Sequence, residues 1–111
     1  MPDENLSTFR AEVREDTGTF VITARGELDL VGAPRLLQAL PSEGSAPVVL
    51  DLSHVGFMDS SGLRSLLEAR QACADAGRDF AISRPSEAVT RVLELVDLLG
   101  EFTRVDPPPA S

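Results

Sequence analysis

The sequence has little of what most metal and nucleophilic sites require. Its 111 residues include a single cysteine, Cys73, and a single histidine, His54. One cysteine cannot form a disulfide within the chain, and one histidine with scattered carboxylates supplies no paired-ligand spacing for a metal. We therefore expect no metal site. Cys73 lies on an apolar helix face and is predicted to be a small core residue.

Basic side chains are also scarce. Ten of them stand against eighteen acidic ones, which gives a net charge of −8. Such a surface repels a phosphate backbone, which argues against nucleic acid as a direct partner. No phosphate-cradling loop of the P-loop kind is present, so we expect neither bound nucleotide nor any other cofactor. Proteins with basic patches are the expected partners, although an acidic surface that only maintains solubility is commoner.

Long apolar runs are absent as well. No stretch is long enough to span a bilayer, and 42% hydrophobic with 25% charged residues is ordinary for a globular protein. The acidic, polar N-terminus lacks the basic and apolar regions of a secretion signal. We expect no membrane association and a cytoplasmic location. The length predicts one domain over residues 8–105, between a flexible leader (1–7) and a flexible proline-rich tail (106–111).

The residue patterns predict an α/β domain. Period-two alternation over residues 9–15 and 19–25, around the turn Asp16-Thr17-Gly18, indicates a β-hairpin. Residues 26–29 are expected to leave the sheet, and the apolar run 48–52 reads as a central strand covered on both faces. Further helices are expected at 33–40, at 60–76 and after the cap Ser86, and further strands at 80–83 and 102–105.

This order of elements predicts a mixed β-sheet. Four to five strands would be joined by right-handed helical crossovers, with the helices mainly on one face of the sheet. Arg70 does not fit the pattern, because it falls in the middle of the apolar stripe of the helix over 60–76. Its aliphatic stem is expected to pack while its guanidinium reaches solvent.

The most informative stretch is Met58-Asp59-Ser60-Ser61-Gly62, at the junction between the central strand and the following helix. The first N–H groups of a helix lack internal partners, and the helix dipole favours an anion there. A phosphate on one of the serines would be tolerated at this position. The residues alone leave three hypotheses: an active-site serine, a regulatory serine, or a helix cap formed by Asp59 or Ser60.

An active-site serine would need a base and an orienting carboxylate. His54 could serve as the base for Ser60 or Ser61, with Asp51 or Asp59 as the orienting group. Nothing in the spacing brings the imidazole to a hydroxyl, and the Gly-x-Ser-x-Gly turn of many hydrolases is missing. We therefore expect no catalytic residues and no enzymatic activity.

Several stretches together carry a family resemblance. Residues 48–53 and 57–63 resemble the signature of STAS-domain anti-sigma factor antagonists, and Gly26-Glu27-Leu28-Asp29 resembles the motif after the family's second strand. The order of elements matches from Phe9 to Val105. Gly32-Ala33-Pro34 departs from the pattern, since the family often has a polar capping residue there.

The resemblance implies a bacterial partner-switching protein. Its unphosphorylated form would bind an anti-sigma factor that is also a serine kinase, and so release the sigma factor. Phosphorylation would break that complex, and a serine phosphatase would reset it. In the family the second serine of Asp-Ser-Ser-Gly accepts the phosphate, which corresponds to Ser61. The partner-binding residues expected on this basis are Asp29, Met58, Asp59, Ser60, Ser61, Gly62 and Arg64. A STAS scaffold or transport-complex subunit without phosphorylation is the alternative.

Overall fold

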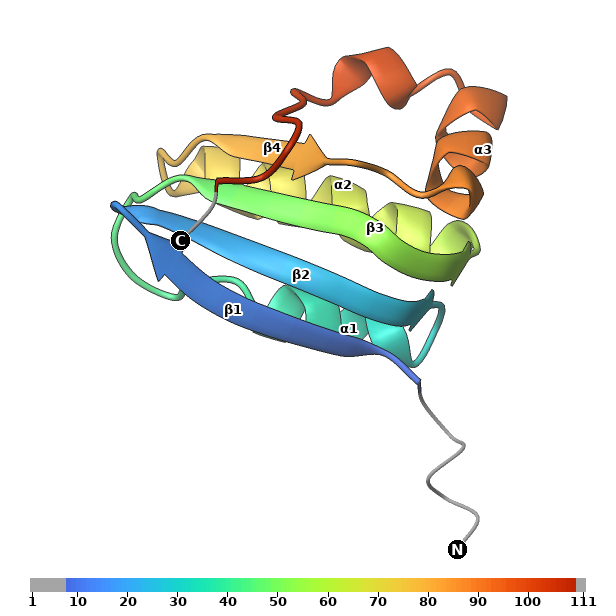
Figure 1. Cartoon of the computed structure of the whole chain (residues 1–111), viewed down its shortest axis with the longest axis horizontal. Coiled ribbons are helices and arrows are strands. Elements are labelled where there is room, and N and C mark those ends of the chain that lie inside the picture. The colour runs from blue at the N-terminus through green and yellow to red at the C-terminus, as the bar shows by residue number, and fades with distance from the viewer. Residues whose placement is uncertain (1–7, 110–111) are drawn as a thin grey trace, which may run out of the picture.

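The computed structural model describes residues 8–109 and shows one four-stranded mixed sheet (Figure 1). Its spatial order is β1-β2-β3-β4, with β1 and β2 antiparallel and the other two pairs parallel. The mixed sheet expected from the sequence is thus confirmed. The leader predicted over 1–7 and the last two residues of the predicted tail lie outside the described residues. The strands are β1 (Arg10–Asp16), β2 (Thr19–Leu28), β3 (Val48–Met58) and β4 (Phe80–Ser83).

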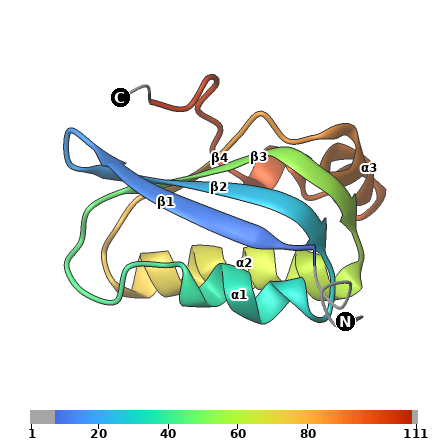
Figure 2. The same cartoon turned by 60° about the horizontal axis from the view of Figure 1, so that its bottom comes forward.

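The two helices that frame the candidate site lie on one face of this sheet. Figure 2 shows α1 (Gly32–Gln38) and α2 (Ser60–Asp75) side by side beneath the strands. A third helix, α3 (Glu87–Leu95), packs near the end of β3 and is followed by a short 3₁₀ helix, η2 (Leu99–Glu101). The prediction that the helices lie mainly on one face is confirmed.

The core fills the space between the sheet and these helices. Ile22, Leu50 and Ile82 lie beside one another on neighbouring strands and are almost fully buried. Burial of each such side chain stabilises the fold by about 1.5–3 kcal/mol relative to its exposure. Leu66 and Cys73 of α2 join the same cluster, so the prediction of a core cysteine is confirmed.

Three predicted boundaries are wrong. Residues 26–28 stay in the sheet and only Asp29 leaves it, because β2 continues to Leu28 through register shifts around Gly26, whose φ of 101° suits glycine. The central strand does not end at residue 52 but runs on to Met58, since pairing with β2 continues past the polar residues that interrupt its apolar run. Residues 102–105 form no strand, because only Arg104 bridges the short β4, at Ile82.

The misfit arginine of α2 has a partner. The Arg70 guanidinium lies 4.8 Å from the centroid of the buried Phe102 ring and donates to the Glu101 carbonyl at 3.2 Å. A cation over an aromatic face contributes about 0.5–1 kcal/mol at such a partly exposed place. Arg70 therefore attaches the segment after η2 to the edge of the helix layer.

Candidate functional site

The candidate site forms where β2 and β3 end next to each other. These strands are parallel, and their last residues, Leu28 and Met58, are paired in the register. The chain enters α1 after the first and α2 after the second, so both helices begin at the same edge of the sheet. Asp29 and the stretch 58–62, which the resemblance joined in one surface, are brought together by this topology.

Asp59 is the cap of α2. Its Oδ1 accepts hydrogen bonds from the backbone N–H groups of Ser61 at 2.9 Å and Gly62 at 3.1 Å. A side-chain cap of this kind stabilises a helix by about 1 kcal/mol. Of the two capping residues proposed from the sequence, the structure therefore selects Asp59, and neither serine side chain is used for this purpose.

Asp29 forms the same arrangement at the start of α1. Its Oδ1 accepts from the N–H groups of Val31 at 3.1 Å and Gly32 at 2.9 Å. Its backbone carbonyl accepts from Ala33 at 2.8 Å. Asp29 thus holds the turn that leads into α1, whose own N-cap residue, Val31, makes no side-chain cap hydrogen bond.

Gly62 allows α2 to rest directly on the end of the sheet. A Cβ atom at this position would lie 2.2 Å from the Leu28 carbonyl oxygen and 2.7 Å from Met58 Cγ, closer than real Cβ contacts occur. The Asp59 N–H also donates to that Leu28 carbonyl, at 3.4 Å. Met58 itself is only 5% exposed and packs into the core beneath the junction.

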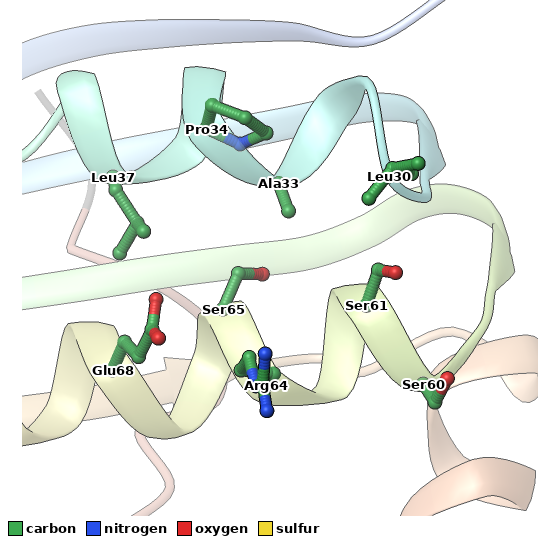
Figure 3. Close-up of a pocket in the computed structure, with 9 residues that line it drawn as sticks. All are labelled: Leu30, Ala33, Pro34, Leu37, Ser60, Ser61, Arg64, Ser65 and Glu68. Carbon is green, nitrogen blue, oxygen red and sulfur yellow. The ribbon is translucent and has the colours of Figure 1, made fainter.

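A groove of about 440 Å³ runs between the two helices, lined by α1 on one side and α2 on the other. Figure 3 shows the side chains of Ser61 and Ser65 directed toward α1, whereas Ser60 lies at the first turn of α2 and farther from it. Arg64 follows Ser61 by three residues and lines the same groove. The lining residues are Leu30, Ala33, Pro34, Leu37, Ser60, Ser61, Arg64, Ser65 and Glu68.

The polar side chains of the groove differ in whether they have hydrogen-bond or ion-pair partners. The Ser65 hydroxyl donates to the Gly62 carbonyl at 2.7 Å within α2. Among residues 8–109, the Ser61 hydroxyl and the Arg64 guanidinium have no hydrogen-bond or ion-pair partner. Ser61 is half-buried and Arg64 exposed. Within residues 8–109 the groove therefore offers two free hydroxyls, those of Ser60 and Ser61, and one free cation at the positive end of a helix.

Exposed apolar side chains surround this end of the sheet, and reasoning from the sequence missed them. Leu30 is 75% exposed, Val31 44% and Phe57 48%. Single exposed apolar residues are common, but these three lie on the two chain segments that flank the junctions. One signal was available in the sequence: the spacing Asp-x-x-Gly occurs at both 29–32 and 59–62.

The residues of the active-site hypothesis are not assembled. His54 is exposed on β3 and lines a separate hollow with Ser86 and Arg91. No hydrogen bond in the described part of the chain joins it to Ser60 or Ser61.

Asp51, proposed as the orienting group, is hydrogen-bonded to Ser53 and Arg84 instead. Burial raises the pKa of its carboxyl, but hydrogen bonds from the Ser53 N–H and hydroxyl and from Arg84 outweigh that and hold the pKa below its usual range. Arg84 lies 2.9 Å from Asp51, and its backbone N–H donates to Asp106 at 2.7 Å. This network connects β3, β4 and the start of the segment predicted as a tail.

Two further properties concern residues 8–109 as a whole. They include no helix that is both long and apolar enough to cross a membrane. They also include no group of three or more histidine, cysteine or acidic side chains placed to hold a metal ion.

Comparison with known proteins agrees with the fold described above, a small α/β domain with a mixed sheet. The family model of the STAS domain matches residues 10–108. The chain therefore belongs to the STAS domain family.

Three solved structures are similar to the chain. An anti-sigma factor antagonist from Mycobacterium paratuberculosis is 29% identical, with 96% of this chain and 89% of that one covered and a TM-score of 0.76. The Bacillus cell-fate determinant SpoIIAA in its phosphorylated form is 20% identical over 90% of this chain and 93% of that one, with a TM-score of 0.62. A murine anion transporter, Slc26a9, is 18% identical over 74% of this chain but 14% of its own length, with a TM-score of 0.62.

Proposed function

We propose that this STAS domain is an anti-sigma factor antagonist, and that phosphorylation of Ser61 switches off its binding to an anti-sigma factor with serine kinase activity. The observation that carries the proposal is the Ser61 hydroxyl, which is directed into the groove and has no partner among residues 8–109 (Figure 3). The 29% identical antagonist supports the choice of partner class.

The fold has no need of the hydroxyl that would be modified. Asp59 caps α2 through its own carboxylate, and Ser61 contributes only its backbone N–H to that cap. A phosphoserine carries about −1.5 to −2 charges at pH 7. At a helix N-terminus this charge stabilises the fold by about 0.3–1 kcal/mol, and the free Arg64 offsets repulsion from Asp59. The folded state should therefore survive phosphorylation.

Partner binding is where the charge acts. The unphosphorylated groove presents the exposed Leu30 beside a neutral hydroxyl, and a partner that covers both removes them from water. A phosphate in the same contact would be a desolvated charge or face a like charge, at a cost of about 2–5 kcal/mol. The affinity would fall by about 30-fold to several thousand-fold.

The partners proposed are an anti-sigma factor serine kinase and a serine phosphatase that removes the phosphate. Neither nucleic acid nor a membrane is proposed to bind directly, in keeping with the net charge of −8. The switch would operate in the cytoplasm, where sigma factors meet their regulators. The chain itself would be a binding module and not an enzyme.

The test is incubation of the purified protein with ATP and each anti-sigma kinase of the source organism, followed by peptide mass mapping. We expect one phosphate, on Ser61. Ser60→Ala is the matched control, because Ser60 is the exposed neighbour outside the cap, and this variant should still be modified. Phosphate found only at residues other than Ser61 would overturn the proposal.

Two further variants distinguish an effect of charge on partner binding from a loss of the folded structure. Ser61→Ala should bind the partner without being phosphorylated, whereas Ser61→Asp should bind at least tenfold more weakly, about 1.4 kcal/mol or more, with an unchanged circular dichroism spectrum. A Ser61→Asp protein that binds as the unmodified protein does would contradict the electrostatic account. Tight binding at the groove with no phosphorylation by any kinase would favour the scaffold or transport-complex alternative.

A further inference from the structure

Within residues 8–109, no strand pairs with the outer edge of β1. β1 is the terminal strand of the sheet, and Figure 1 shows no described element alongside its outer side. An unpaired edge of seven residues is a template for pairing with another strand. Proteins commonly block such an edge with charged side chains, and β1 carries five of them, Arg10, Glu12, Arg14, Glu15 and Asp16. The arrangement of these charges decides whether the edge rejects every additional strand or accepts a strand with a matching charge pattern.

The free hydrogen-bonding groups of this edge can be assigned from the register. The Phe20 N–H donates to the Pro47 carbonyl at 2.9 Å, so the backbone of Phe20 faces away from β1. Its partner in the register, Glu15, must therefore direct its own N–H and C=O away from β2. Because the direction alternates along a strand, Ala11 and Val13 face the outer edge too. Among residues 8–109, none of these three has a backbone partner for its N–H or C=O group on that side.

The charge pattern of β1 is complementary to that of a second copy of the same strand running antiparallel to it. Val13 lies at the centre of the strand, with Glu12 and Arg14 on either side of it and Arg10 and Asp16 at the two ends. If a second copy pairs antiparallel about a two-fold axis at Val13, each Glu12 lies opposite an Arg14. Each Arg10 then lies opposite an Asp16. These pairs occupy the positions where backbones are not hydrogen-bonded and facing side chains come closest.

Neighbouring registers are unfavourable. Sliding one strand by two residues places Glu12 opposite Glu12 and Arg10 opposite Arg14. Sliding it the other way places Arg14 opposite Arg14 and Glu12 opposite Asp16. Like charges directly opposite one another destabilise a strand pair, and a shift by one residue puts side chains on the wrong face. The register centred on Val13 is therefore selected over those beside it.

The described side chains leave capacity for these contacts. Val13 is 47% exposed and would be covered by Val13 of the second copy. Glu12 uses one carboxylate oxygen to accept from Arg25 at 3.0 Å. Arg14 donates through Nη2 to the Pro109 carbonyl, while its Nη1 is buried and has no hydrogen-bond partner among residues 8–109. To face Glu12 of the second copy, this guanidinium would have to turn outward and expose its Nη1.

We propose that two copies of this chain associate through β1, so that their sheets join into one continuous sheet with two-fold symmetry. The contact is isologous, with the same strand on both sides. None of the residues that line the groove at Ser61 belongs to β1, so both grooves of the dimer stay open. The association is thus independent of the function proposed for Ser61.

Sedimentation equilibrium of the full chain over a range of concentrations tests the proposal. The unmodified protein should dimerise reversibly. Glu12→Arg and Arg14→Glu each create two like-charge contacts across the axis, and each should weaken dimerisation about tenfold or more. An equimolar mixture of the two variants should regain the lost affinity, because every facing pair in the mixed dimer is again of opposite sign.

The recovery in the mixture distinguishes register-specific pairing from damage to the fold. Glu87→Arg is the matched control, since it reverses a charge of an exposed ion pair on α3 and should leave dimerisation unchanged. Circular dichroism should show all variants folded. A protein that remains monomeric up to about 1 mM, single variants that dimerise as the unmodified chain does, or a mixture that recovers nothing would each overturn the proposal.

Discussion

The two strand-to-helix junctions of this domain have the same backbone design and different surface chemistry. At residues 29–32 and 59–62 an aspartate Oδ1 accepts from the N–H groups two and three residues further on, at distances between 2.9 and 3.1 Å. A glycine closes each segment where a Cβ would collide with a strand carbonyl. The aspartate hydrogen bonds and the close contact with the sheet are therefore provided twice, by the same two residue types, although only Asp59 is the N-cap of its helix.

The residues between aspartate and glycine are what differ. The first junction carries Leu30 and Val31, 75% and 44% exposed, and the second carries Ser60 and Ser61. Since capping and packing are already provided by the outer positions, the two inner positions are free to serve recognition. One junction presents an apolar surface and the other hydroxyls, on opposite sides of a single groove.

The largest effect should come from filling the glycine positions. In Gly62→Ala the new Cβ would lie 2.2 Å from a backbone oxygen, against 2.5 Å in Gly32→Ala. We expect Gly62→Ala to lower the free energy of unfolding by about 3 kcal/mol or more, and Gly32→Ala by somewhat less. Urea unfolding measures both. Gly56→Ala is the control, because its Cβ would meet nothing within 4 Å. Equal stability of Gly62→Ala and the control would refute the close-contact account.

Truncating the apolar junction should affect binding and leave folding intact. Leu30→Ala is expected to weaken affinity for the anti-sigma partner by about 1–3 kcal/mol if Leu30 is covered in the complex, as the proposed function requires. Its stability should change by less than about 0.5 kcal/mol. Calorimetric titration provides the affinity. Leu95→Ala, 79% exposed at the end of α3, should bind normally. Equal losses for both variants would mean that the groove is not the contact.

Substitutions of Asp29 and Asp59 should affect stability in the same order, because both carboxylates accept from two backbone N–H groups. Asp59→Ala removes the acceptor for two N–H groups and should cost about 1 kcal/mol, while Asp59→Asn retains an acceptor and should cost much less. Asp29→Ala and Asp29→Asn should show the same order at the shorter helix. Thermal unfolding monitored by circular dichroism measures the differences. If Asn destabilised either site as much as Ala, the carboxylate charge and not the cap would be responsible.

The smallest expected effect is the pH dependence of the stability that the Asp51–Arg84 pair contributes. Asp51 lies on β3, the strand that leads to the second junction, and its pKa is lowered in the fold. A lowered pKa contributes stability above the unfolded value of about 3.9, which is lost as the pH falls through the folded value. Arg84→Gln should therefore reduce stability by less than about 1 kcal/mol at neutral pH, since Arg84 is 48% exposed. The deficit should shrink below about pH 4 in urea titrations. A deficit that grows in acid would contradict this linkage.

Much of the architecture could be predicted, because local patterns encode it. Alternation identified the hairpin, an apolar run identified the first half of β3, and the helix α2 was placed within one residue of its end. The ends of β2 and β3 were missed because Gly26 and the polar residues after Leu52 suggest loops, whereas pairing between the strands keeps them extended. Such pairing is not local.

The candidate site was predicted in part. The stretch 58–62 was located at the correct junction, and its place beside Asp29 follows from parallel strands that end together. The groove could not be foreseen, since the exposure of Leu30 and the free Ser61 hydroxyl depend on how closely α1 and α2 approach. Each helix is also held against the end of a strand by a close contact at Gly32 or Gly62, and such contacts are not local in the sequence.

The Leu28 carbonyl has a consequence for signalling. It accepts a hydrogen bond from the Asp59 N–H and packs closely against Gly62. The end of β2 and the first turn of α2 are therefore in direct contact. A modification at Ser61 has no loose segment to displace. Phosphorylation would then change the charge of this surface and leave its backbone in place. The phosphorylated and unphosphorylated domains should superpose while their electrostatic potentials differ.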